Sequence, residues 1–215
     1  ARAAEGLAVV MGLPIGVKGR AYNAAALAYG GRLQGLVIKN NLNWQERRVF
    51  SPAIESPLAD EWPWPIYEGE RGRFDVPGFG ALQVGFADDL KAEPVAKTLA
   101  MLGAFPSRAG GGAQRLGRIS ALAGDSLCAW ANAGANESST DQVYDGQAII
   151  LEGGRLLAVT APFSGDCALP DEGALNAPNM RTPWEPDPAM PYAPLDLEAR
   201  AAWCREALEI AAQGL

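Results

Sequence analysis

Two short apolar segments separated by a pair of glycines constrain the fold more than any other feature of this sequence. Residues 21–29 and 32–38 are mostly apolar, and Gly30-Gly31 stands between them. Consecutive glycines supply the positive φ angles of a tight turn, so this pattern predicts a β-hairpin. An apolar run over residues 7–14, closed by glycine and proline, predicts a buried strand just before it. The chain therefore opens within a β-sheet.

Further apolar segments predict additional strands and two helices. Strands are expected at 74–76, 82–86, 126–133 and 147–159, and Gly153-Gly154 marks a turn within the last of these. The expected fold class is therefore α/β (α+β).

The first helix is predicted to begin at Asp88 and to follow a strand directly. Its apolar residues at helical spacing are Val95, Leu99 and Leu102. A second helix is predicted from Asp196 to Gly214. The residues that share its apolar face are Ala201, Cys204, Leu208 and Ala211. The glycine-rich segment 109–112 is predicted to be a loop that does not open a helix after a strand, so it is not a phosphate-binding loop.

Charge and residue counts exclude several classes of function. The 215 residues carry a formal net charge of −7, so nucleic acid is not an expected partner. Histidine is absent, which excludes Ser-His-Asp and Cys-His nucleophiles and histidine-ligated zinc. Three widely spaced cysteines without a C-x-x-C pair fit a reducing compartment, so a cytoplasmic location is expected. No apolar run reaches the ~18 residues that a membrane span requires.

Four stretches resemble the amidase domain of glutamine-dependent NAD synthetases, a domain of the nitrilase superfamily. They follow the order of the family and cover nearly the whole chain. The stretches are Gly12-Leu13-Pro14 with residues 22–26, Val37-Ile38-Lys39 with residues 45–50, residues 136–148 with Tyr144-Asp145-Gly146, and residues 200–215. The resemblance implies a nitrilase-like αββα sandwich over residues 1–195, followed by a linker helix over 196–215 that leads toward a synthetase domain.

The resemblance also implies roles for individual residues. The family hydrolyses glutamine to glutamate and ammonia with a Glu-Lys-Cys triad, in which cysteine attacks the amide and lysine stabilises charged intermediates. Lys39 matches the family's lysine, and Glu46 matches a second glutamate that orients the substrate near it. Ser107 falls where the family lines its glutamine pocket. Because a thiolate needs only a nearby base and a cation, this chemistry does not require histidine.

The nucleophile elbow departs from the family's pattern. Where the family has Gly-Phe-Glu-Ile-Cys-Glu-Asp, this chain reads Gly85-Phe86-Ala87-Asp88-Asp89, which is about two residues shorter and leaves Ala87 at the vacant nucleophile position. The strand that follows the elbow helix is expected to be missing. The family's first strand, helix and second strand, with the catalytic glutamate, would precede Ala1, so a truncated or degenerate copy is expected.

Each of the three cysteines is expected to be structural rather than catalytic. Cys128 has apolar neighbours and is predicted to be buried and inert, and Cys204 lies on the apolar face of the last helix. Cys167 is predicted in an exposed loop, where the neighbouring Asp166 would raise the pKa of the thiol.

Three hypotheses about function follow from these residues. The first is a glutamine amidohydrolase domain for NAD synthesis from deamido-NAD whose activity is lost or impaired, so the sequence leaves open whether the chain is an enzyme. The second is a non-catalytic interaction subunit, and the third is a free-standing amidase. No cofactor is expected in this chain, because ATP and deamido-NAD would bind the synthetase domain, whose Ser-Gly-Gly-x-Asp-Ser signature the sequence lacks. Glutamine is the expected small-molecule substrate if the site is active. The chain is expected to form either a homo-oligomer or a hetero-oligomer with a synthetase domain. No association with a membrane is expected.

Overall fold

The structure of the chain is a computed structural model that divides into two compact units. It describes residues 6–53, 63–69, 72–91, 94, 96–139, 141–170 and 192–214. The first unit consists of Ala1–Gly103, Leu122–Trp130 and Glu152–Gly154, and the second consists of Ala104–Ala121, Ala131–Leu151 and Arg155–Leu215. The boundary at residue 195 expected from the sequence stays a prediction.

A four-stranded sheet opens the first unit, and the sequence predicted its first three strands. Its strands are β1 (Ala8–Val17), β2 (Arg20–Tyr29), β3 (Arg32–Ile38) and β4 (Ile66–Glu68), in that order. β1, β2 and β3 pair antiparallel, whereas β4 pairs parallel to β3. Gly30 and Gly31 have φ angles of 56° and 74°, values that glycine adopts without strain. The predicted β-hairpin is therefore confirmed.

A second sheet holds the remaining strands. These are β5 (Arg73–Val76), β6 (Gly80–Phe86), β7 (Thr98–Gly103), β8 (Leu127–Asn132), β9 (Ala148–Glu152) and β10 (Arg155–Val159), with strand order β10-β9-β8-β7-β6-β5. The strands predicted around residues 74, 82, 126 and 147 are confirmed, with Gly153-Gly154 between β9 and β10. The sequence predicted no strand over the residues of the short strand β4.

The helix predicted to begin at Asp88 is wrong, because residues 98–103 form strand β7. β7 pairs parallel to β6, and its buried residues Leu99 and Met101 alternate with less buried neighbours. The spacing of Leu99 and Leu102 suits a helix as well as a strand, and so short a segment does not distinguish the two periods. Val95 lies outside the described residues. The strand predicted to be missing after the elbow is thus present, while the described residues between β6 and β7 contain no helix.

The sequence did not predict helix α1. α1 (Gly112–Ala123) begins at the last glycine of the 109–112 segment, which follows β7, so the prediction that this loop opens no helix was wrong. Its most buried residues are Arg115, Ile119 and Ala123, at intervals of four. The stripe includes an arginine, so the apolar pattern that signals an amphipathic helix is weak here.

The last predicted helix is confirmed. α2 (Leu197–Gln213) is capped by Asp196, whose side chain accepts the N–H of Ala199 at 2.7 Å, and it ends at Gly214. Two single-turn helices, η2 (Glu46–Arg48) and η6 (Ala135–Glu137), complete the described elements. Within the described residues, no helix has the length and apolar character needed to cross a bilayer.

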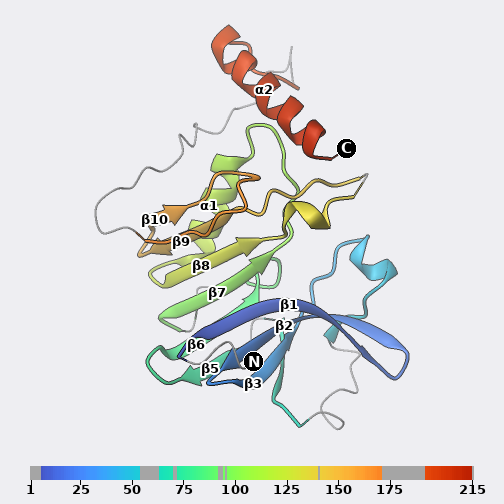
Figure 1. The fold of residues 1–215 in the computed structure, drawn as a ribbon, viewed down its shortest axis with the longest axis vertical. Coiled ribbons are helices and arrows are strands. Elements are labelled where there is room, and N and C mark those ends of the chain that lie inside the picture. The colour runs from blue at the N-terminus through green and yellow to red at the C-terminus, as the bar shows by residue number, and fades with distance from the viewer. Residues whose placement is uncertain are drawn as a thin grey trace. The chain divides into compact units, whose positions relative to one another are not determined.

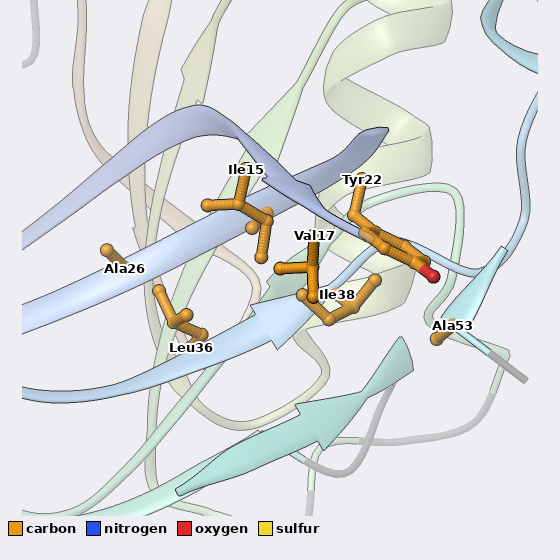
Figure 2. Close-up of a cluster of buried hydrophobic side chains, with 8 residues drawn as sticks. Ile15, Val17, Tyr22, Ala26, Leu36, Ile38 and Ala53 are labelled. Atoms are coloured by element: carbon orange, nitrogen blue, oxygen red, sulfur yellow. The ribbon is translucent and has the colours of Figure 1, made fainter. Parts of the chain in front are cut away.

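Both faces of the central strands β2 and β3 are buried in the first unit. One face packs on β5, β6 and β7, as the blue and green strands of Figure 1 show, and alternate residues of β2 and β3 such as Leu27 and Val37 contribute to this core. The opposite face carries a second cluster, drawn in Figure 2, which includes Ile15, Tyr22 and Ile38. Because both faces of these strands are buried there, residues 24–28 of β2 and 36–38 of β3 form continuous apolar runs rather than alternating with polar residues.

Gly72 provides a test of the packing between the two sheets. A Cβ at Gly72 would lie 2.4 Å from a methyl of Val37 and 2.4 Å from the carbonyl oxygen of Val84, which is backbone and cannot move away. We expect Gly72→Ala to lower the free energy of unfolding by about 2 kcal/mol, measured by urea denaturation. Gly117→Ala is the matched control, because a Cβ at Gly117 meets no atom within 4 Å and alanine favours helix α1. Equal effects of the two substitutions would contradict this packing.

Candidate functional site

Lys39 lies at the end of β3, with its side chain almost completely buried in the first unit. Its backbone N–H donates to the carbonyl oxygen of Asn23 on β2 at 2.8 Å, which continues the sheet pairing to the residue itself. The side chain is 3% exposed, and its ammonium lies 5.9 Å from the centre of the Phe86 ring. A buried ammonium requires compensating carboxylates, and the structure supplies two.

Glu46 is the first of these carboxylates. The Lys39 ammonium donates to both of its oxygens, at 2.8 and 2.9 Å. The backbone N–H of Asn43 and the side-chain amide of Asn23 donate to the same carboxylate at 2.9 and 3.2 Å. The Asn43 side chain in turn accepts the N–H groups of Gln45 and Glu46, so it holds the short helix η2 in place. Glu46 is thus fixed by the backbone as well as by the lysine.

Asp88 is the second carboxylate, and it directly follows Ala87, the residue that the resemblance places at the position of the nucleophile. The Lys39 ammonium donates to Oδ2 of Asp88 at 3.0 Å. Ala87 is 1% exposed, and its N–H donates to the carbonyl oxygen of Leu102 on β7 at 2.9 Å. The structure therefore brings Lys39 and Glu46 together with the segment that contains Ala87.

A third carboxylate, Asp89, fixes the backbone that follows Lys39. Its oxygens accept the N–H groups of Asn40, at 2.9 Å, and of Asn41. Burial raises the pKa of Asp89, and although these two N–H groups lower it, the pKa remains above its usual range. Asp89 therefore ties the turn after β6 to the loop after β3.

The ammonium of Lys39 has no N–H group left for another acceptor. A lysine ammonium carries three N–H groups, and here they match three oxygens, two from Glu46 and one from Asp88. Burial lowers the pKa of Lys39, but the hydrogen bonds and charges of Glu46 and Asp88 raise it by more than burial lowers it. The pKa of Lys39 therefore lies above its usual value. The lysine is thus a permanently charged group that is neutralised within the protein.

Ser107, the fourth residue predicted for the site, lies in the second unit. Its hydroxyl donates to Oδ2 of Asp145 at 2.9 Å, and its N–H donates to the carbonyl oxygen of Val143 at 2.8 Å. The described contacts of Ser107 hold the loop that contains the Tyr-Asp-Gly turn. The assignment of Ser107 to a glutamine pocket stays a prediction.

Asp145 is the centre of a buried polar network in the second unit. Arg115 on α1 donates to Oδ2 of Asp145 and, at 3.1 Å, to the side chain of Gln147. The other carboxylate oxygen accepts from Asn132 at 2.9 Å and from the N–H of Gln147 at 3.0 Å. Burial raises the pKa of Asp145, but Arg115, Asn132 and Gln147 lower it more, so the pKa lies below its usual range. The network connects α1, β8 and the start of β9.

The sequence did not identify Asp88, Asp145 or Arg115 as members of these two arrangements. Asp88 was predicted to begin a helix, and only the quoted elbow stretch pointed to its place near the lysine. Asp145 belongs to the Tyr-Asp-Gly turn of the resemblance, which marked the position without its buried partners. No pattern in the sequence singled out Arg115, because an arginine in a helix is normally a surface residue.

The cysteines are placed as the sequence predicted for Cys128 and Cys167. Cys128 on β8 is fully buried, and burial raises its pKa to about 12, so it is a protonated, inert thiol at neutral pH. Cys167 and Cys204 are exposed and belong to the second unit. The first unit, which contains Lys39, therefore has Cys128 as its single cysteine.

Removing the Lys39 charge should destabilise the first unit. Lys39→Met leaves Glu46 and Asp88 as neighbouring carboxylates without their cation, so we expect the free energy of unfolding to fall by about 3 kcal/mol. Lys97→Met removes a lysine that is exposed, and its effect should stay within about 0.5 kcal/mol. Urea denaturation of both variants measures the difference. Equal stabilities of the two variants would contradict a buried, compensated ammonium.

The lowered pKa of Asp145 predicts a dependence of stability on pH. A carboxyl whose pKa is lower in the folded state stabilises that state above its unfolded pKa, near 3.8, and loses this contribution as the pH falls through the folded pKa. We expect Asp145→Asn to be less stable than the unmodified chain by about 3 kcal/mol at pH 7. This difference should shrink below about pH 4.

Urea denaturation between pH 3 and pH 7 measures this prediction. Asp141→Asn is the control, because Asp141 is exposed and its replacement should produce no such pH-dependent difference. A difference for Asp145→Asn that stays constant down to pH 3 would show that the ion pair is not its cause.

Comparisons of the sequence with curated proteins and of the fold with solved structures find similar proteins in the same group. No protein-family model matches the sequence. The chain is 30% identical over 190 residues to glutamine-dependent NAD(+) synthetases of Mycobacterium bovis and of two Mycobacterium tuberculosis strains. These alignments cover 72% of this chain and 26% of the relatives, so the chain spans about a quarter of their length.

Solved structures resemble the chain more distantly in sequence. A glutamine-dependent NAD(+) synthetase from Cytophaga hutchinsonii matches with a TM-score of 0.58 at 20% identity, over 74% of this chain and 28% of that one. The glutamine-dependent NAD+ synthetase of Acinetobacter baumannii matches with a TM-score of 0.56 at 17% identity, over 75% of this chain and 30% of that one. Nit3 of Saccharomyces cerevisiae, from the nitrilase superfamily, matches with a TM-score of 0.54 at 19% identity, over 73% of this chain and 56% of Nit3.

Proposed function

We propose that this chain, which is homologous to part of the glutamine-dependent NAD(+) synthetases and has the fold of the nitrilase superfamily, is a form of their glutamine amidohydrolase domain that does not hydrolyse glutamine. The homology and the nitrilase-like fold predicted from the sequence are both confirmed. The activity, the substrate and the partners of the whole synthetase are not transferred with them, since the chain spans about a quarter of those proteins.

The three occupied N–H groups of Lys39 are the observation that carries this proposal. The resemblance assigns the lysine to the charged intermediates of amide hydrolysis, and a cation stabilises an oxyanion by donating an N–H to it. Here the Asp88 carboxylate takes the N–H that Glu46 leaves free. An anionic intermediate would have to displace a carboxylate of the protein, which opposes rather than assists the reaction.

The position next to Asp88 also lacks an attacking atom. The methyl group of Ala87 cannot replace a thiolate, and Cys128, the cysteine of the same unit, is buried on β8 with a pKa of about 12. Loss of the nucleophile in a comparable covalent mechanism reduces the rate by about 10⁶-fold. Both features support a site that keeps the lysine and the glutamate as structural groups.

The second hypothesis, a non-catalytic interaction subunit, agrees with a separate observation. Helix α2 leaves Leu197 and Leu208 at 76% and 70% exposure on one face of the helix, and an exposed apolar face favours contact with another surface. A subunit that keeps the fold while losing the chemistry would retain value through such a contact. Glutamine as a ligand, and ATP and deamido-NAD as ligands of a separate synthetase domain, stay predictions.

Ammonia release from glutamine tests the proposal. We expect the purified chain to release no ammonia above the background of a buffer control, because it lacks both the attacking thiolate and a free cation. Release that survives purification, is abolished by Lys39→Ala and is unaffected by Lys97→Ala would overturn the proposal. Circular dichroism of both variants shows whether they keep the fold, so that a loss of activity is not confused with unfolding.

A thiol-reactive probe distinguishes the third hypothesis, a free-standing amidase. We expect slow labelling of exposed Cys167 and Cys204 and none of Cys128 in the folded chain. Rapid labelling of one cysteine, together with protection of that cysteine by an amide substrate, would favour the amidase instead.

A further inference from the structure

Helix α2 packs through one face only. In the second unit, Oε2 of Glu206 accepts the N–H of Gly110 at 2.8 Å, and Trp203 lies against the same glycine. Gly214, at the end of the helix, approaches Val143 so closely that a Cβ there would lie 2.7 Å from its methyl group. Even so, none of the residues of α2 is buried. Since most helical stability in proteins comes from packing an apolar face, this helix has a second face to cover.

The other face carries an exposed apolar stripe. Its residues follow one another at alternating intervals of four and three, the spacing of a coiled-coil seam, and all of them are exposed. They are Leu197, Ala201, Cys204, Leu208 and Ala211. Figure 1 shows α2 as one continuous helix in red, so the stripe runs without interruption from the first turn to the last. We name these five residues the α2 stripe.

Charges beside the α2 stripe select the orientation of a partner helix. Glu198 and Arg205 lie seven residues apart on the same side of the stripe, both are exposed, and neither has an ion-pair partner among the described residues. In an antiparallel pair of helices, Glu198 of each copy lies opposite Arg205 of the other copy. Two equivalent ion pairs between opposite charges therefore form. A parallel arrangement instead brings Arg200, on the other side of the stripe, near Arg205 of the second copy, so like charges would meet.

The apolar residues fit the same antiparallel register. When Leu197 of one helix faces Leu208 of the second, Ala201 faces Cys204, so the large residues pair at the ends and the small residues at the centre. Small central residues allow the two helix axes to approach closely there. The ion pairs and the apolar contacts thus share one twofold axis, as a self-complementary interface requires.

We propose that the α2 stripe is a dimerisation surface through which two copies of this chain pair their last helices antiparallel. The proposal is independent of whether the site around Lys39 is active. It also predicts that Cys204 of each copy lies within one helical turn of the twofold axis.

Charge reversal tests the proposal without burying a new group. We expect the chain to be a dimer at micromolar concentration by light scattering. Glu198→Arg and Arg205→Glu should each weaken dimerisation about tenfold, because each variant places like charges together twice in the dimer. The double variant Glu198→Arg/Arg205→Glu should restore the original affinity, since it only exchanges the two signs. Glu152→Arg is the matched control, because it makes the same charge change at an exposed residue outside helix α2.

Crosslinking through Cys204 adds a test of register. In a Cys167→Ser background, a short bismaleimide should link two chains through Cys204, and Leu208→Glu should abolish both the link and the dimer. Circular dichroism of Leu208→Glu should remain unchanged, because Leu208 is exposed in the single chain. A monomer at these concentrations, a dimer insensitive to Leu208→Glu, or a double charge variant no tighter than the single ones would each overturn the proposal.

Discussion

The buried ammonium of Lys39 is the interaction on which the first unit depends. A charge taken out of water is strongly unfavourable unless carboxylates compensate it, so Glu46 and Asp88 must be delivered to one point from separate parts of the chain. Hydrogen bonds fix the segment that carries each carboxylate. The Asn43 side chain positions η2, which contains Glu46, and Asp89 links the backbone after β3 to the turn after β6, which contains Asp88. The ends of a strand from each sheet are thereby joined at a single charged group.

Asp145 holds a comparable position in the second unit, although its partners have different chemistry. There the buried charge is a carboxylate, and a guanidinium, an amide and a backbone N–H share its compensation. Opposite shifts in pKa follow from the same principle. The lysine is held protonated and the carboxyl is held ionised because each charged form has more hydrogen bonds in the protein than its neutral form would have.

The strands and the last helix could be predicted because their signals are local. The hairpin around Gly30-Gly31 and the capped start of α2 at Asp196 each depend on a few consecutive residues, and both are present as predicted. β7 and α1 could not be predicted in this way, since the spacing of Leu99 and Leu102 fits two periods and the buried stripe of α1 contains Arg115. The resemblance located Lys39 and Glu46, but only the structure shows that Asp88 satisfies the lysine.

Parallel strands are usually separated by a long connection, and this makes the pairing of β6 with β7 unusual. Only residues 87–97 join the two strands, against residues 39–65 for the parallel pair β3 and β4. Closing the shorter loop is favoured by roughly 0.8 kcal/mol in chain entropy. Among the parallel contacts of the first unit, β6 with β7 is therefore the more local, and local contacts form early in folding. This short connection consequently gives the folding chain a rapid route to the parallel pair β6 and β7, to which the other strands of the second sheet can then be added.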